Sequence, residues 1–175
     1  MNKSKVITWV LAIGVTAFVV YAVTNGVFES NPVGENVAFD HFIEQPKNIS
    51  TSPVVCESSL DAVNGIHPIP DTLTADKTLT VQGWMAIDTK NGTVPDSVFV
   101  TLTAANGKAQ YVKARSTPRS DVKEYFKQPN MSDPGFEANI DTSSLDGNYV
   151  LGLARLYQGQ VEQCQYNIPL VISHK

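Results

Sequence analysis

Residues 78–141 decide the fold: TLTVQGWMAIDTKNG (78–92) and SVFVTLTAANGKAQYVKARS (97–116) lead into TPRSDVKEYFKQP (117–129), and GFEANID (135–141) follows. In the first, second and last of these segments, apolar residues alternate with polar ones, which is typical of half-buried β-strands. The two Asn-Gly pairs are turn signals between strands. These strand-turn-strand units predict the centre of a small β-sandwich.

The segment 117–129 interrupts this strand pattern and predicts a helix of at most about three turns. Thr117 followed by Pro118 matches an N-cap with proline at the first helical position, and Pro129 ends the segment. With the flanking strand patterns, the count reaches seven to eight strands at the turn spacing of an immunoglobulin-like antiparallel sandwich. The sequence therefore predicts an all-β domain over residues 54–175 with one short inserted helix.

Trp84 has two alternative environments in this scheme. Strict alternation places it on the polar side of its strand. A β-bulge at Gly83 would switch the face and bury the indole, whereas an uninterrupted strand would leave Trp84 exposed as a platform.

The composition limits the domain count and the classes of partner. A chain of 175 residues suffices for one folded domain and a tail. The 13 Lys and Arg residues are scattered and the net charge is −4, so the chain lacks the basic face that nucleic-acid binding requires.

The N-terminal segment 1–24 is predicted to be a membrane anchor. Residues 6–24 carry no charge, and as a helix they would roughly match the hydrocarbon core of a bilayer. Lys3 and Lys5 precede this run and acidic residues follow it, so the N-terminus is expected in the cytoplasm. The alternative is a cleaved signal peptide, although the run exceeds the usual length of its apolar region.

Residues 25–53 are predicted to be a linker with one short helix at 36–45. Phe39, Phe42 and Ile43 would share one face of that helix. This face would pack on the sandwich or lie on the membrane surface, or it would dock on a partner membrane protein.

Cys56 and Cys164 are the only cysteines. In an exported chain such a pair predicts one disulfide, here joining the first strand to the last. Two cysteines without a nearby histidine do not provide the ligand spacing of a metal site.

A resemblance adds to this interpretation. The strings GWMAID, VFVTL, YVKARSTPRSDVKEYF, GFEANIDTSSL and GNYVLGL resemble a β-sandwich domain of bacterial envelope proteins. In those proteins the domain often follows a polytopic glycosyltransferase-like or uncharacterised membrane region. The resemblance implies an envelope location, a polytopic membrane partner and envelope glycan as a second kind of partner. The single predicted span implies an accessory protein whose partner is encoded separately.

No catalytic residue, cofactor or metal site is predicted, because the three histidines lie apart and no nucleophile, phosphate-loop or metal-ligand motif is present. The candidate ligand or partner groove is instead a set of aromatic, basic and acidic side chains around the short helix. Either these charges pair structurally at the helix start, or they line a groove for a sugar or peptide. The set consists of Trp84, Tyr111, Arg115, Arg119, Asp121 and Tyr125.

From these observations we expect a noncatalytic, single-pass protein of the bacterial inner membrane with a periplasmic sandwich, acting as an interaction or accessory subunit of a larger membrane complex. The alternative is a carbohydrate-binding module for envelope glycan, using Trp84, Tyr111 and Tyr157.

Overall fold

The computed structural model describes residues 38–50 and 52–174. The predicted anchor at 1–24 and the first part of the predicted linker lie outside these residues. Within the described ranges, no helix has both the length and the apolar character to cross a membrane.

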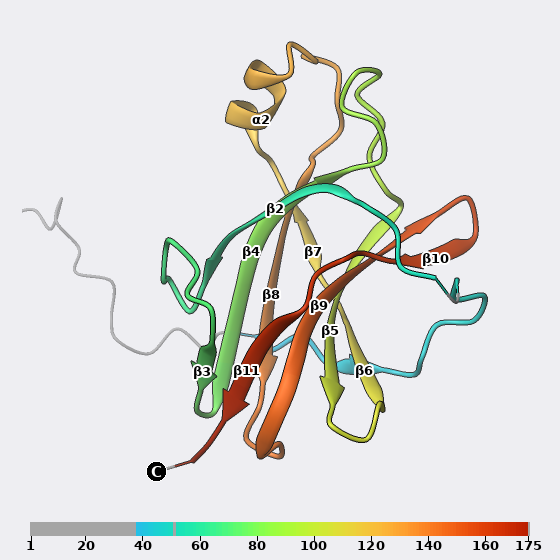
Figure 1. Cartoon of the computed structure of the whole chain (residues 1–175). Coiled ribbons are helices and arrows are strands. Elements are labelled where there is room, and N and C mark those ends of the chain that lie inside the picture. Colours follow the sequence, from blue (N-terminus) through green and yellow to red (C-terminus); the bar gives the residue numbers. More distant parts are fainter. Residues whose placement is uncertain (1–37, 51, 175) are drawn as a thin grey trace, which may run out of the picture. The chain divides into compact units, whose positions relative to one another are not determined.

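Two sheets form the described part of the chain, and they lie face to face (Figure 1). All strand pairs in them are antiparallel except the parallel pair of β11 and β3. The four-stranded sheet has the order β2-β4-β8-β7, and the seven-stranded sheet has the order β1-β6-β5-β9-β11-β3 with β10 also paired to β9. The strands of the first sheet are β2 (Glu57–Val63), β4 (Thr78–Ala86), β8 (Gly135–Asp141) and β7 (Arg115–Thr117). Those of the second are β1 (Phe42–Ile43), β6 (Ala109–Lys113), β5 (Ser97–Ala104), β9 (Gly147–Tyr157), β10 (Gln160–Gln163), β11 (Ile168–Ile172) and β3 (Leu73–Ala75).

The strand order is that of an immunoglobulin-like sandwich. In that fold the first, second, fifth and fourth strands form one sheet, and the third, sixth and seventh form the other. The same order is found here when β2 and β3 are counted as one interrupted strand, and β10 and β11 as another. Strands β6 and β1 are then additions beside β5. The prediction of an immunoglobulin-like sandwich is confirmed. The predicted number of seven to eight strands was too low, because turn signals do not reveal two- and three-residue strands such as β1, β3 and β7.

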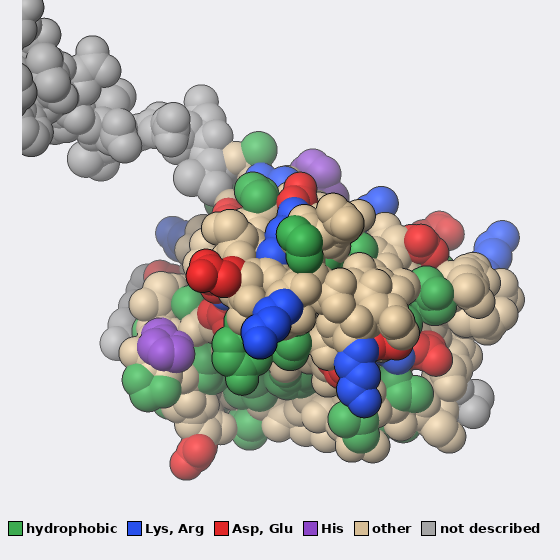
Figure 2. All heavy atoms as spheres, turned by 90° about the horizontal axis from the view of Figure 1, so that it is seen from above, with side chains coloured by type: hydrophobic (Ala, Val, Ile, Leu, Met, Phe, Trp, Pro, Cys, Tyr) green, Lys and Arg blue, Asp and Glu red, His purple; other side chains and the backbone are tan. Residues whose placement is uncertain are grey.

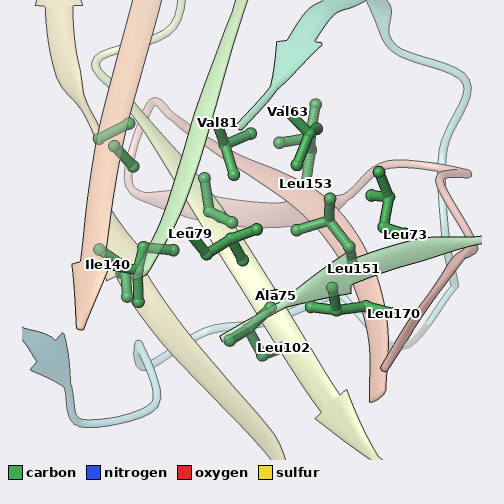
Figure 3. Packing of buried hydrophobic residues seen from close by; sticks show 14 of the residues in the cluster. Val63, Leu73, Ala75, Leu79, Val81, Leu102, Ile140, Leu151, Leu153 and Leu170 are labelled. Atoms are coloured by element: carbon green, nitrogen blue, oxygen red, sulfur yellow. The ribbon is translucent and has the colours of Figure 1, made fainter. Parts of the chain in front are cut away.

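The main core lies between the two sheets. In β4, Leu79, Val81 and Met85 are buried at alternate positions, as the sequence pattern predicts. They meet residues of the facing sheet such as Leu102 and Leu151, and Figure 3 shows these aliphatic side chains interleaved between the layers. The alternating pattern of each strand therefore determines which face of each sheet is buried.

The described part of the predicted linker, residues 38–50 and 52–53, is attached to the sandwich. The predicted helix at 36–45 is absent from its described part, and strand β1 pairs there with β6 instead. Phe42 packs against the main core, whereas Phe39 and Ile43 are 39% and 41% exposed. The free edge of β6 offers backbone partners along its length, and this tertiary pairing outweighs the weak helical spacing of three apolar residues.

Side chains close the edges of the four-stranded sheet where its strands extend beyond their neighbours. At one edge the Asp40 amide donates to the Asn139 carbonyl oxygen (2.7 Å), and the Asn139 amide donates to Asp40 Oδ2 (2.8 Å). At the other edge the Asn64 amide donates to the Thr80 carbonyl oxygen and the Thr80 amide to Asn64 Oδ1, both at 2.8 Å. These bonds satisfy backbone groups that would otherwise be open to another strand.

The disulfide between Cys56 and Cys164 is present, as predicted. Cys56 precedes β2 of the four-stranded sheet, and Cys164 follows β10 of the seven-stranded sheet. Val54 and Cys164 also form a parallel bridge. The disulfide thus links the two layers near the chain's entry into the sandwich.

Replacing both cysteines by alanine should lower the free energy of unfolding by about 2–5 kcal/mol, because the crosslink closes a long loop, with a sequence separation of 108 residues. Denaturant unfolding of the full chain measures the difference. Reductant should destabilise the wild type and leave the double variant unchanged. Equal stability of the oxidised wild type and the variant would contradict this assignment.

His174, which follows β11, contacts the loop between β3 and β4 and the loop between β8 and β9. Its Nδ1 lies 3.0 Å from Asp76 Oδ1, and its Nε2 lies 2.7 Å from the Leu145 carbonyl oxygen. Both partners are acceptors, so only the protonated imidazolium can donate to both. The hydrogen bond to Asp76, followed by that to Leu145, raises the pKa of His174 above its ordinary value of 6.5.

We expect this contact to stabilise the fold fully below pH 6.5 and to be lost as the pH rises through the raised pKa of the folded state. Thermal unfolding of the wild type and His174→Gln between pH 5.5 and 8.5 tests this. The difference in melting temperature should be largest at the acid end and shrink towards pH 8.5. A difference that is constant with pH would contradict a protonated His174.

Candidate functional site

Four of the six residues predicted for the groove lie near one end of the sheets, where helix α2 (Ser120–Tyr125) is located (Figure 1). The helix begins later than predicted, with Arg119 at the N-cap position and no side-chain cap. Figure 2 looks onto this end of the sandwich and shows hydrophobic, acidic and basic side chains interspersed. We call the residues that gather here the aromatic–arginine cluster: Asp61, Trp84, Arg119, Asp121, Tyr125 and Phe126.

The aromatic part of the cluster is built on the outer face of β4. The alternation of β4 is uninterrupted, so Trp84 lies opposite to the core, where it is half-buried. Its ring meets Phe126 edge-to-face with centroids 5.3 Å apart, and Phe126 meets Tyr125 at 4.9 Å. Tyr125 is 79% exposed. Trp84 is therefore neither in the core nor a bare platform, because the end of α2 covers it.

The bulge expected at Gly83 lies instead in the partner strand, between Leu60 and Ala62 of β2. Gly83 has a different role: a Cβ there would collide with the Ser59 carbonyl oxygen and come within 2.8 Å of the Phe136 ring. The glycine thus allows two strands and a core aromatic ring to approach closely.

Arg119 is held by two carboxylates. Its Nε and one terminal nitrogen donate to Asp121 at 2.8 and 2.7 Å, and the other terminal nitrogen donates to Asp61. Asp61 is the extra residue of the β2 bulge. A Cβ on Gly135 would lie 2.6 Å from Arg119 Cγ, so the aliphatic stem crosses directly over this glycine. Arg119 therefore ties the start of α2 to β2 across the sheet.

The ion pair changes the pKa values of both Arg119 and Asp121. The hydrogen bonds from Arg119 lower the pKa of Asp121 from 3.8 to about 2, and the same bonds raise the pKa of Arg119. With its donors directed at two carboxylates, the guanidinium is poorly placed to bind an anionic ligand as well. The geometry favours the structural alternative for Arg119 and Asp121.

Asp121 should stabilise the fold above pH 3.8 and lose this contribution as the pH falls through about 2. The difference in unfolding free energy between the wild type and Asp121→Asn should therefore be larger at pH 6 than at pH 2. The control is Asp71→Asn, at an exposed aspartate outside the ion pairs of the described residues. The same pH dependence in both variants would contradict a specific role for Asp121.

Two residues of the predicted groove lie elsewhere. Arg115 is on β7, 3.3 Å from Glu137 Oε1 and 3.7 Å from Asp40 Oδ2. Tyr111 is completely buried on the outer face of the seven-stranded sheet, where its hydroxyl accepts a hydrogen bond from Gln163 Nε2 (3.0 Å). The six residues therefore do not form one groove, because β6 and β4 belong to different sheets.

Tyr111 belongs to a second, smaller core on that outer face, together with Phe99, Ala154 and Val161. Ile49, from the segment predicted to be a linker, packs against it. The linker segment thus covers part of the sheet and buries Tyr111.

Beside this second core lies a hollow of about 520 Å³ that the sequence pattern does not reveal. Thr101 and Thr103 alternate with core residues of β5, so from the sequence they look like ordinary surface positions. A larger polar groove, of about 840 Å³, runs along Thr78, Thr80 and Gln82 of β4. In the part of the chain that the structure describes, no group of three or more His, Cys, Asp or Glu side chains is placed to hold a metal ion.

No protein-family model matches the chain, and no functionally curated protein matches it. Among solved structures, the chain is similar to the crystal structure of the Lin-41 filamin domain, with 14% sequence identity and a TM-score of 0.38. The match covers 70% of this chain and 98% of that chain. The strand order described above remains the basis of the fold assignment.

Proposed function

We propose that the protein is a noncatalytic, membrane-anchored interaction subunit of a bacterial envelope complex, with its sandwich in the periplasm. The observation that carries this proposal is the solvent exposure of the side chains of Phe39 and Ile43. Both are partly exposed, while Phe42 between them is packed against the core and β1 is paired with β6. Ile43 lies on the paired strand β1, and Phe39 directly precedes Asp40, which forms a bridge to Ile140. Large apolar side chains on backbone held in this way lose little conformational freedom when a partner covers them.

The disulfide supports the proposed compartment. Disulfides persist in oxidising environments such as the periplasm and are rare in the cytosol. Cys56 and Cys164 are bonded across the two sheets. An apolar run at 6–24 is suited to anchor the chain in the inner membrane. In the sequence, Phe39 follows this run closely, so a polytopic protein of the same membrane is the partner that best fits.

The aromatic–arginine cluster provides a second apolar contact. Tyr125 projects from α2 and is backed by Phe126, and a rigid exposed tyrosine is a common anchor in protein interfaces. Because Arg119 is paired with Asp61 and Asp121, the contact would be made mainly by the aromatic rings.

Site-specific photo-crosslinking in intact membranes tests the proposal. A photoreactive residue at position 39 or 43 should give recurrent cross-links to one polytopic membrane protein, identified by mass spectrometry. The matched control is position 106, an exposed residue in the turn between β5 and β6. Cross-links confined to the chain itself, or identical patterns from 43 and 106, would contradict an accessory subunit.

Glycan binding is the second candidate function, but the three aromatic residues predicted for it do not form a sugar platform. Tyr111 is buried, and Trp84, which is on the other sheet, is covered by Phe126. Tyr157 is half-buried at the end of β9, where it pairs with Gln160. The specific observation that favours this candidate is the hollow beside the second core, whose described lining residues are uncharged and rich in hydroxyl and amide groups.

A further inference from the structure

The hollow lies where the ladder between β9 and its neighbour is interrupted. Gln163 of β10 pairs with Ala154, and Ile168 of β11 pairs with Leu151. Four residues, 164–167, therefore oppose two residues of β9. This excess makes the chain bulge away from β9 between the labelled strands β10 and β11 (Figure 1). Bulges of this kind re-aim side chains and often lie beside functional sites.

The lining of the hollow is neutral and polar. Thr101 and Thr103 come from β5, and Gln163, Gln165 and Asn167 come from the chain around the bulge. None of the described lining residues is charged. The apolar part of the lining includes Pro53, Val150, Leu153 and the disulfide-bonded Cys164.

Thr101 is the most informative of these residues. It is only 6% exposed, and its hydroxyl makes no hydrogen bond to another described residue. A Cβ on the neighbouring Gly152 would lie 2.7 Å from Thr101 Oγ1 and 3.3 Å from the Tyr166 carbonyl oxygen. The glycine thus leaves room for a hydroxyl and a carbonyl oxygen to converge. No buried side-chain oxygen or nitrogen of the described residues lacks a hydrogen-bond partner, so this hydroxyl is not an unsatisfied buried group. Its place in the lining of the hollow leaves it available to a ligand.

The backbone around the hollow is not free to bind an extended peptide. β5 is paired with β6 and β9, and β9 is paired with β5, β10 and β11. A peptide bound by strand addition requires an open strand edge. A ligand here must therefore be recognised mainly by side chains, together with single backbone groups of the bulge such as the Tyr166 carbonyl oxygen.

We infer that this hollow binds a neutral saccharide. Hydroxyl and carboxamide groups both donate and accept hydrogen bonds, as the hydroxyls of a sugar do. The absence of charge among the described lining residues disfavours phosphorylated, sulfated or acidic ligands, which require a cationic partner. The volume falls within the range of small-molecule sites. Val150 and Pro53 provide an apolar surface for the C–H face of a sugar ring.

This inference rests on the glycan-binding candidate, gives it a site, and is independent of the interaction-subunit proposal. The full chain is purified in a detergent without a sugar headgroup. Saturation-transfer NMR and calorimetry are then performed with maltose and N,N′-diacetylchitobiose, and with glucuronic acid as the charged comparison. We expect a neutral disaccharide to bind at millimolar concentration or below and glucuronic acid not to bind.

Thr101→Val should weaken this binding by about tenfold, corresponding to the loss of one hydrogen bond. Its melting temperature should equal or exceed that of the wild type, because the hydroxyl has no described protein partner to lose. Gln165→Ala, at an exposed position of the bulge, should also weaken binding. Thr80→Val, in the other polar groove, is the matched control and should bind as the wild type does.

The possible outcomes distinguish an error in the assigned site, the hollow, from an error in the glycan-binding candidate itself. Binding of a neutral disaccharide that is unaffected by both Thr101→Val and Gln165→Ala would overturn this site while leaving glycan binding elsewhere on the domain. No binding of either neutral disaccharide would overturn the site and the glycan-binding candidate together. Stronger binding of glucuronic acid than of the neutral sugars would overturn the assignment of a neutral ligand.

Discussion

Burial of the apolar faces of the two sheets against each other is the interaction on which the rest of the structure depends. β4 and β8 supply one face through Val81 and Ile140, and β5 and β9 supply the other through Leu102 and Leu151. Each strand contributes every second residue, so the remaining residues must lie on the outer faces. The burial pattern therefore places Trp84 and Thr101 outside the main core, although both are partly or mostly covered.

Closure of the sandwich depends on a few polar and covalent contacts. Asp40 and Asn64 cap exposed backbone at opposite edges of the four-stranded sheet, and the Cys56–Cys164 disulfide links the layers. These contacts protect the edges that could pair with other chains. They leave the outer faces, and the exposed side chains of Phe39 and Ile43 at the β1 edge, as the surfaces available for recognition. On one outer face, Arg119 is paired with the carboxylates of Asp61 and Asp121. On the other, Thr101 lines the hollow and has no described partner.

The two outer faces differ in the kind of ligand that they suit. The aromatic–arginine cluster has its charges compensated internally and offers Tyr125 as an apolar contact, which suits a protein surface. The hollow beside the second core has polar groups with spare hydrogen-bonding capacity and no charge among its described lining residues, which suits a small neutral ligand. The proposed partner protein and the proposed saccharide would therefore bind at separate places, because the core of the sandwich separates the two faces.

The sequence by itself determined the all-β class, the immunoglobulin-like sandwich, the disulfide and the inserted helix, because alternation, turn residues and a lone cysteine pair are local or compositional signals. Only the tertiary structure decided that 42–43 is a strand, that Tyr111 is buried, and that Arg119 is paired with Asp61 as well as Asp121. The hollow could also be found only in the tertiary structure. It depends on residues 164–167 lying opposite only two residues of β9, which is a property of strand register. Register and sheet membership arise from contacts between distant segments, and residue spacing along one chain does not encode them directly.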